Sequence, residues 1–570
     1  MTDRIPPPRA LARSASQALA YLRGHARVLL LPLVVLLATD AVVQSLWLGQ
    51  SPGQALQGLA VALPALLLLS IVALSIGAAW VRIALAVLVL CINYAQYAFW
   101  AFYGRFLGAG ELHLAAANSS HELVESIVLY FSGPALLAAL ATTAAYAFVI
   151  FRRAPFAASR RRAAIAVLAL AAWCILVDTA MPSQRLYSPV PAFATTNVRW
   201  IVEHLRAEQA VHPGRRAAPP PSGAAADFDV IYLIGESIRA DRLKPNAYAR
   251  DVAPLLHSLK LPHVTFNNVT SAGDCTGRSV PMLMVQPAQP LNVDLYRRPT
   301  LFGYAKQAGY RTAFVNSNEN EWREFVDDNI DTLYRNVDPA GGEDHWAFRT
   351  DAAMLPVIDH IANSPGRHFI VIETYTSHWP YGDRYESCPE CRVYRPDLVG
   401  KAVPFAPIYR AKITNSYDNA IVYFDRFVSQ TLALLRKPTL IVLTSDHGES
   451  LGEENRWGHC SAGIEQMLVP LTLIATDENV ALAAGFSELM QKADVPLSHA
   501  NILPTLLKLF GYDVAKLEFP YAADIGSMTG AGRSERPVLV SEYGAGEQTV
   551  SFGFVSAQRT FTRIETVRVE

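Results

Sequence analysis

The sequence predicts two structural parts, an N-terminal α-helical membrane domain and a C-terminal α/β sandwich with a mostly parallel sheet. Of the 570 residues, 51% are hydrophobic, which is more than a soluble enzyme needs, and the apolar excess lies before residue 182. After residue 228, short apolar runs alternate with helical patterns, as in βαβ units. We therefore expect a membrane domain over 1–181, a connection over 182–227 and a catalytic domain over 228–570.

Five apolar segments near the N-terminus each approach the ~20 residues that a helix needs to cross a bilayer. They are residues 28–48, 59–79, 81–103, 127–151 and 163–180. The second and third are separated only near Gly77 and Arg82, so four or six spans also fit. A cleavable signal peptide fits less well, because the first run is long and four more follow it.

Arginines predict the orientation of these spans. Five precede residue 28 and five lie within 152–162, so both stretches belong in the cytoplasm. The loop between the third and fourth spans instead carries acidic residues and histidines. An odd number of crossings then places everything after residue 182 outside, in the periplasm of a Gram-negative cell. The net charge of −1 argues against a nucleic-acid partner.

The connection between the two parts changes character along its length. An amphipathic piece with Trp200, Ile201 and Leu205 predicts an interfacial helix. Three consecutive prolines from Pro219 onward then predict a linker, and a disordered tether is the alternative for the part after Val211.

The C-terminal part is expected to contain five core strands with helices between or after them. The strands are predicted at 229–234, 311–315, 369–372, 439–443 and 470–474. The helices are predicted at 301–308, 351–361, 415–435 and 500–510.

Acidic residues and a histidine follow two of these strands directly. Asp446 and His447 come after the strand 439–443, and Glu236 comes after the strand 229–234. Ligands of open α/β sheets gather beyond the carboxyl ends of the strands, so these side chains are expected to converge. Together they would make an oxygen-rich zinc site with one open position. Taken singly, each residue has an ordinary alternative, an Asx turn, a solvated carboxylate or a satisfied histidine.

A polar, glycine-bearing loop over 271–281 contains the candidate nucleophile, Thr276. A hydroxyl placed there can coordinate a metal, lose its proton and attack phosphorus. At a helix N-terminus it would also have backbone N–H groups directed at the phosphoryl charge. The alternative is an ordinary N-cap, the more frequent role for a single threonine.

Two further histidines follow predicted strand ends. His378 comes after the strand 369–372, and His459 lies in a short loop after Asp446 and His447. Either can hold a second cation or the phosphate of a substrate, and a structural role is the alternative for each.

Five motifs resemble those of the membrane-anchored phosphoethanolamine transferases, a family that includes the lipid A enzymes of polymyxin resistance. They are Gly235-Glu236-Ser237-x-Arg239-Ala240-Asp241, Thr276-x-x-Ser279-Val280-Pro281, Ser377-His378-x-Pro380, Asn415-Ser416-Tyr417-Asp418-Asn419 and Ser445-Asp446-His447-Gly448-Glu449-Ser450-Leu451-Gly452-Glu453. The resemblance covers nearly the whole chain. It implies the alkaline phosphatase and sulfatase fold, a five-helix anchor in the bacterial inner membrane and a periplasmic catalytic domain.

The resemblance also implies roles for single residues. Glu236, Thr276, Asp446 and His447 would hold the catalytic Zn²⁺, with Thr276 as the nucleophile. His378 and His459 would match the substrate and second-zinc region, and whether a second zinc binds stays open. Phosphoethanolamine would pass from phosphatidylethanolamine through a phospho-threonine to lipid A or the lipopolysaccharide core.

Two features depart from the pattern of this family. The cysteines that flank the nucleophile loop in several members are replaced by Ala272 and Met282, and Cys275 instead precedes the nucleophile. The Ser-His-Gly-Pro pattern of many members has Trp379 in place of glycine. Both departures concern the acceptor more than the chemistry.

Other functions remain open. Sulfatases convert the cysteine of a Cys-x-Pro-x-Arg motif into an aldehyde, but here Cys275 is followed by Thr276, Gly277 and Arg278, without the proline. A phosphoglycerol transferase, or another sulfatase-fold enzyme that modifies envelope glycans, would share the anchor and the metal site. A non-catalytic membrane sensor or scaffold would have lost a ligand or the nucleophile, and none is lost here.

Four of the six cysteines lie in the exported part, where free thiols tend to oxidise. Cys388 and Cys391 have the spacing of a tight local bridge, and a zinc knuckle would need two more ligands that the nearby sequence lacks. Cys275 and Cys460 would lie at the same rim of the sheet as the expected site. A second bridge between them is then sterically feasible, provided that their Cα atoms come within about 7 Å.

Overall fold

The computed structural model describes most of the chain from residue 78 onward. The described residues are 38–39, 42–43, 63–65, 68, 78–103, 106–108, 127–128, 130–151, 160–180, 189–209, 215–243, 248–285, 297–317, 325–335, 350–401, 403–517, 523–528, 535–540, 549–556 and 558–568. The predicted spans 28–48 and 59–79 lie almost wholly outside them.

The chain divides into two compact units, residues 1–116 with 132–209, and residues 117–131 with 210–570. The first unit contains α3 (Ala79–Tyr103), α6 (Gly133–Ile150), α7 (Arg160–Ala180) and α8 (Pro189–Gln209). Among the described residues, α3 is the helix long and apolar enough to cross a membrane, and α6 and α7 contain shorter apolar stretches. The expected spans 81–103, 127–151 and 163–180 are therefore helical, although the fourth begins only at Gly133. Five crossings stay a prediction.

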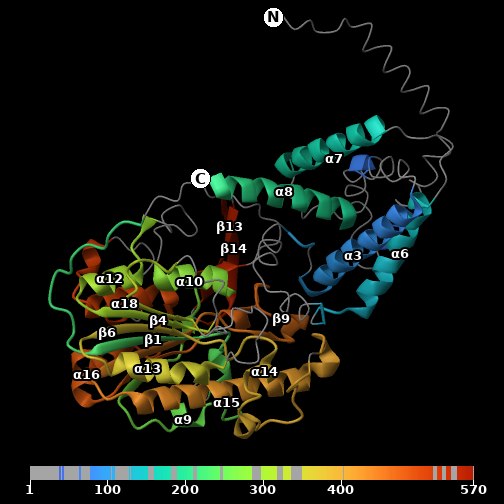
Figure 1. Cartoon of the computed structure of the whole chain (residues 1–570). Helices are drawn as coiled ribbons and strands as arrows, with labels where there is room; N and C mark the ends of the chain where they lie inside the picture. Colours follow the sequence, from blue (N-terminus) through green and yellow to red (C-terminus); the bar gives the residue numbers. More distant parts are fainter. Residues whose placement is uncertain are drawn as a thin grey trace, which may run out of the picture. The chain divides into compact units, whose positions relative to one another are not determined.

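Helices α3 and α6 pack side by side within this unit (Figure 1). Tyr97 of α3 is fully buried and its hydroxyl lies 3.1 Å from the Thr142 hydroxyl of α6. Asn93 donates a hydrogen bond of 3.0 Å to the hydroxyl of Thr143. The expected interfacial segment forms the helix α8.

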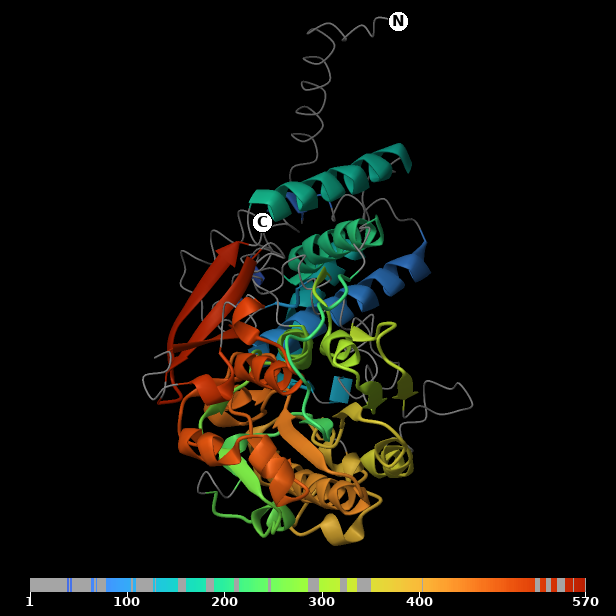
Figure 2. The same cartoon turned by 90° about the vertical axis from the view of Figure 1, so that its left-hand side faces the viewer.

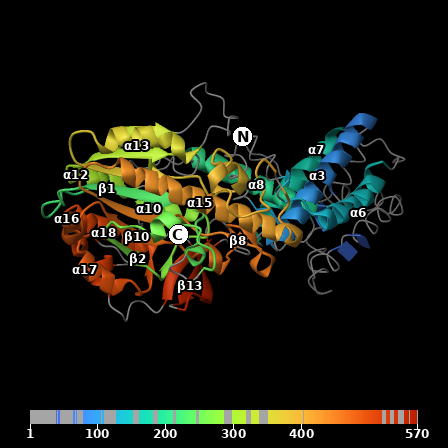
Figure 3. The same ribbon diagram turned by 90° about the horizontal axis from the view of Figure 1, so that it is seen from below.

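The second unit is built on a seven-stranded sheet with the order β2-β10-β7-β1-β6-β4-β5. The strands are β1 (Asp229–Gly235), β2 (His263–Phe266), β4 (Arg311–Asn316), β5 (Thr332–Arg335), β6 (His368–Glu373), β7 (Thr439–Ser445) and β10 (Leu471–Ala475). Neighbours pair in parallel except at β10, which runs antiparallel to both β7 and β2. Figure 3 shows β2 and β10 on the side opposite to α13 (Leu355–Ala362). The predicted α/β fold with a mostly parallel sheet is confirmed.

Helices cover both faces of this sheet (Figure 1). One face carries α10 (Thr276–Met284), α12 (Leu301–Gln307) and α18 (Ile502–Leu509), and the other carries α13 and α15 (Arg410–Leu434). Every residue of β1 and β7 is buried, which explains why these strands have nearly continuous apolar sequences. The main apolar core lies on the side of α12 and α18 and includes Tyr232, Phe302 and Phe369.

All five predicted core strands are present, as β1, β4, β6, β7 and β10, and all four predicted helices are present with shifted ends. The edge strands β2 and β5 were not predicted, because each has only four residues. A separate antiparallel sheet of β12 (Glu535–Val540), β13 (Thr549–Ser556) and β14 (Phe561–Arg568) was also not predicted. Its strands are red at the left in Figure 2.

Candidate active site

Glu236 and the pair Asp446 and His447 lie at one edge of the sheet because their strands are neighbours in register. Gly235 at the end of β1 pairs with Ser445 at the end of β7, so the next residue on each strand is an acid. The backbone N–H groups of Ser237 and His447 donate to Oδ1 of Asp446 at 3.0 and 2.7 Å. These bonds orient the second oxygen, Oδ2, away from the backbone.

Thr276 reaches the same point from a different part of the chain. Its Oγ1 donates to Oδ2 of Asp446 at 2.8 Å and lies 3.1 Å from Nε2 of His447. The N-cap of α10 is Cys275, and Thr276 is the first helical residue, so its side chain does not act as the ordinary N-cap of the alternative interpretation. The sharp loop before it requires Gly273, where a Cβ would lie 2.8 Å from the backbone N of Ser279.

The four side chains form a compact and buried donor set. Nε2 of His447 is 3.5 Å from Oε1 of Glu236 and 3.3 Å from Oδ2 of Asp446. With the 3.1 Å to Thr276, these separations match the ~3.3 Å between neighbouring ligand atoms around a tetrahedral zinc with ~2.0–2.1 Å bonds. Two carboxylates, an imidazole and a hydroxyl are suitable donors for zinc, so the residues fit the ion.

The protonation of His447 suits metal binding. Its Nδ1 lies 2.7 Å from the carbonyl oxygen of Gly448, so Nδ1–H donates there and the Nε2 lone pair faces the other donors. Burial lowers the pKa of His447, and the nearby charge of Asp446 only partly opposes this effect. The neutral imidazole that a metal requires is therefore favoured.

The two additional histidines lie next to this donor set. Among the described residues, the ligand atoms of Glu236, His447 and His459 lie within 4.8 Å of one another. The ring of His459 is 4.5 Å from that of His447, and the ring of His378 is 5.6 Å from that of His459. The structure thus brings together all six residues that the sequence singled out, from loops that follow β1, β3 (Val269–Thr270), β6, β7 and β9 (Trp457–Gly458).

The two additional histidines differ in charge. Nδ1 of His459 lies 2.9 Å from Oε2 of Glu449. Burial lowers the pKa of His459, but the Glu449 carboxylate outweighs this effect and raises the pKa to about 9. Burial lowers the pKa of His378 well below its usual range, and Nδ1 of this residue lies 2.6 Å from the carbonyl oxygen of Trp379. His459 is therefore a cation near neutral pH, and His378 is neutral.

Sequence reasoning assigned no role to two residues that support this site. Glu449 pairs with His459 and also accepts a hydrogen bond from the Tyr381 hydroxyl, at 2.9 and 2.5 Å. His499 is fully buried, and its Nδ1 accepts the backbone N–H of Ala272 at 3.2 Å. An acid two residues after His447, and a histidine directly before the predicted helix 500–510, were the available signals.

Trp379, which replaces a glycine of the family pattern, belongs to a packed aromatic cluster. Its ring centroid is 4.8 Å from that of Tyr381 and 4.7 Å from that of Phe405, and only 6% of the residue is exposed. Phe405 in turn stacks on Trp457 at 5.7 Å. Trp379 therefore stabilises the loop that carries His378.

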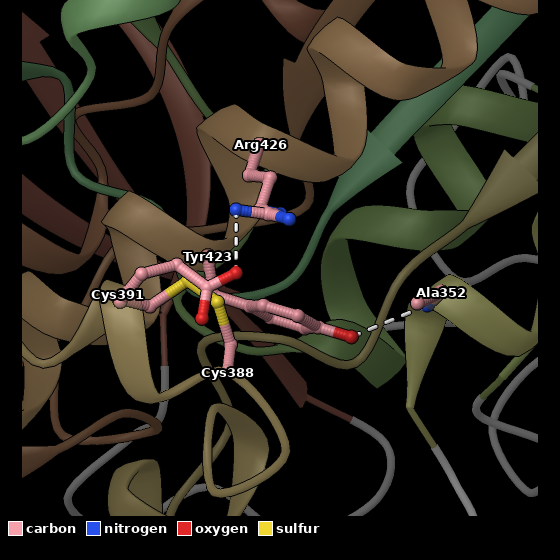
Figure 4. The surroundings of a disulfide bond; sticks show 6 residues. Ala352, Cys388, Cys391, Tyr423 and Arg426 are labelled. Carbon is pink, nitrogen blue, oxygen red and sulfur yellow. Dashed lines mark hydrogen bonds and ion pairs between the residues drawn. A yellow bond between two sulfur atoms is a disulfide. The ribbon is translucent and has the colours of Figure 1, made fainter.

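The cysteines of this unit occur as two pairs. Cys388 and Cys391 form the predicted disulfide, which Figure 4 shows beside Tyr423 and Arg426 of α15. Arg426 pairs there with Glu390 at 2.6 Å. The second expected bridge is not formed in this structure. Cys275 and Cys460 are both free thiols. The backbone N–H of Cys460 nevertheless donates a hydrogen bond of 2.9 Å to the carbonyl oxygen of Asp274, the residue before Cys275.

Asp351, near the loop of His378, makes a pH-dependent contribution to stability. Its Oδ1 accepts hydrogen bonds from Ser317 at 2.9 Å and from the Tyr375 N–H at 3.0 Å, while Oδ2 has no partner within the described part of the chain. Burial raises the pKa of this carboxyl to about 6 against the opposing effect of these bonds. The pKa of Asp351 is therefore higher in the folded chain than in the unfolded chain, so ionisation of this carboxyl lowers the free energy of unfolding. This penalty is complete above about pH 6 and disappears below about pH 4.

We expect Asp351→Asn to raise the free energy of unfolding by on the order of 2–3 kcal/mol near neutral pH, since an amide has no ionisation penalty. The gain should shrink to about zero near pH 4. Thermal unfolding of the full chain across this range measures both values. A difference between variant and parent that stays constant with pH would contradict the assignment.

A family model and several known proteins match this chain. The sulfatase family model matches residues 229–512. The chain is 27% identical over 304 residues to the Kdo(2)-lipid A phosphoethanolamine 7''-transferase of Escherichia coli (strain K12), covering 50% of this chain and 52% of that protein. It is 28% identical over 314 residues to the phosphatidylethanolamine transferase Mcr-1 of Escherichia coli, covering 51% and 54%. The chain thus spans about half the length of the curated relatives that it matches.

A solved structure extends the likeness to both parts of the fold. It is the integral membrane protein lipooligosaccharide phosphoethanolamine transferase A from Neisseria meningitidis, with a TM-score of 0.60 and 20% sequence identity. The match covers 86% of this chain and 96% of that chain. It confirms the predicted fold class, a helical membrane domain followed by an α/β domain of the sulfatase type.

Proposed function

We propose that the chain is a zinc-dependent phosphoethanolamine transferase, and the match of residues 229–512 to the sulfatase family model supports this. It takes phosphoethanolamine from phosphatidylethanolamine and transfers it to lipid A or to the lipopolysaccharide core. The observation that carries the proposal is the position of the Thr276 hydroxyl, 2.8 Å from a carboxylate and 3.1 Å from an imidazole nitrogen, at the start of a helix.

Glu236, Thr276, Asp446 and His447 would hold the zinc ion. When bound, zinc supplies a Lewis acid that favours the deprotonated hydroxyl and withdraws charge from the phosphoryl group. The support for this ligand set is its donor chemistry, its burial and its 2.8–3.5 Å separations. His459 lies next to His447 and, as a cation, can contact a bound phosphate.

The residues of the chain divide the chemistry between them. Oδ2 of Asp446 accepts the hydrogen bond that Thr276 Oγ1 donates. The lone pairs of Oγ1 therefore point away from Asp446. Oγ1 attacks the phosphorus of the donor, diacylglycerol leaves, and a phospho-threonine forms at the N-terminus of α10. The backbone N–H groups of that helix end face the added negative charge.

The ring of His459 lies next to that of His447, and the ring of His378 lies next to that of His459. Each of these two histidines serves one half of the reaction. His459 can donate a proton to the diacylglycerol oxygen as the first bond breaks. His378 can accept the proton of the acceptor hydroxyl as that oxygen attacks the phospho-threonine. Oδ2 of Asp446 can take the proton of Thr276 Oγ1 in the first transfer and return it in the second, which restores the hydroxyl. The proton that His378 accepts then replaces the one that His459 donated, so protons and charge balance over the cycle.

The N-terminal helices would place this reaction at the membrane. We propose several crossings of the bacterial inner membrane, with the catalytic domain in the periplasm. Because donor and acceptor are lipids, a tether at the bilayer surface replaces a three-dimensional search by a local one.

The donor group can be identified directly. We expect the purified full chain, reconstituted with phosphatidylethanolamine labelled in its ethanolamine and with lipid A, to yield labelled lipid A and one diacylglycerol per transfer. Mass spectrometry of both lipids measures this. Transfer of glycerophosphate from phosphatidylglycerol would instead identify a phosphoglycerol transferase, and no transfer to any lipid would favour the non-catalytic role.

A further inference from the structure

Two thiols lie on neighbouring segments beside the nucleophile. These segments are far apart in the sequence. Cys275 immediately precedes Thr276, and Cys460 immediately follows His459. The backbone N–H of Cys460 donates to the carbonyl oxygen of Asp274 at 2.9 Å. This bond places the backbone of Cys460 against the residue that precedes Cys275, and a disulfide requires Cα atoms within about 7 Å.

A metal ion is a poor occupant for this thiol pair. Nη1 of Arg278 lies 3.0 Å from Sγ of Cys275 and 2.9 Å from Oδ1 of Asp274, so a positive charge already occupies that side. Within the part of the chain that the structure describes, the cluster of possible metal ligands contains neither cysteine. Two adjacent and partly exposed thiols in an exported domain suit oxidation instead.

We propose that Cys275 and Cys460 form a disulfide once the domain is exported, and that this bond fixes the nucleophile segment against the loop of His459. The oxidant is a disulfide donor of the oxidising compartment. One thiol attacks a sulfur of the donor to give a mixed disulfide, which the other thiol resolves. Two electrons and two protons pass to the donor, which leaves as a dithiol, or as two thiols in the case of glutathione disulfide.

The loop of Cys460 gains most from such a bond. Cys460 and Ala462 both have left-handed backbone conformations, with φ of 61° and 56°, which residues other than glycine adopt only when the surroundings hold them. Asp274 holds the loop through the N–H groups of Cys460 and Ala462, at 2.9 and 3.1 Å. A covalent link one residue away would hold Thr276 and His459 at a constant separation.

Peptide mapping under non-reducing conditions tests the bond without reference to activity. The full chain is purified from the membrane, its free thiols are alkylated, and its peptides are identified by mass. We expect a peptide that joins Cys275 to Cys460. The bridge between Cys388 and Cys391 is the internal control for exposure to an oxidising compartment (Figure 4). Alkylated Cys275 and Cys460 in a chain that carries this bridge would overturn the proposal.

Stability variants test the consequence of the bond. We expect Cys275→Ser with Cys460→Ser to lower Tm by roughly 5 °C more than the matched pair Cys388→Ser with Cys391→Ser, because the first bond closes a far longer loop. A reductant opens both bonds in the parent chain but only the bond between Cys388 and Cys391 in the first variant, so it should lower Tm of the parent chain by more. Equal Tm values for the parent and the first variant would show that the link does not hold the site.

Discussion

Thr276→Ala is expected to reduce phosphoethanolamine transfer by roughly 10³-fold or more, since the variant lacks the attacking oxygen. Nothing else in the described site can replace it, because the oxygen that lies between Asp446 Oδ2 and His447 Nε2 is Oγ1 of this residue. The measurement is single-turnover transfer from labelled phosphatidylethanolamine, with the labelled phospho-threonine trapped by acid in the parent enzyme.

Thr276→Ser is the matched control, because it keeps the hydroxyl and loses a methyl group. It should retain measurable transfer and form a labelled phospho-serine. Sustained turnover by the alanine variant, or a label attached to another residue, would show that Thr276 is not the nucleophile.

Removing a metal ligand has the second large effect that we expect. Asp446→Asn keeps an oxygen that can accept the N–H bonds of Ser237 and His447, but it removes the charge that faces Thr276. His447→Ala removes the nitrogen at the centre of the donor set. Each change should weaken zinc binding by about 100-fold or more and reduce transfer in parallel, since a site with few ligands tolerates little loss.

Zinc per chain, measured by elemental analysis after dialysis, checks this prediction. His263→Ala is a suitable control, because His263 is an exposed residue at the start of the edge strand β2, with its Nδ1 at 2.9 Å from the carbonyl oxygen of Leu261. Its zinc content should equal that of the parent chain. Unchanged zinc in both ligand variants would place the metal elsewhere.

The core strands, and the edge of the sheet where the candidate site lies, follow from local sequence. An apolar run such as Thr439–Ser445 forms a buried strand from its composition, and a sheet of parallel strands gathers the residues that follow each strand. Glu236, Asp446 and His447 could therefore be selected without a structure. Short edge strands such as β2 and β5 carry too few residues for a periodic pattern, and they form because a neighbouring strand offers unpaired backbone groups.

The choice of side chains that meet at that edge depends instead on tertiary packing. Thr276 lies 170 positions before Asp446, and no local pattern states that its hydroxyl turns toward that carboxylate instead of capping α10. The same holds for the hydrogen bond between Tyr381 and Glu449. These contacts depend on the strand order and on how each loop is held, which are properties of the packed sheet, whereas the periodicity of a sequence reports only the neighbours of each residue along the chain.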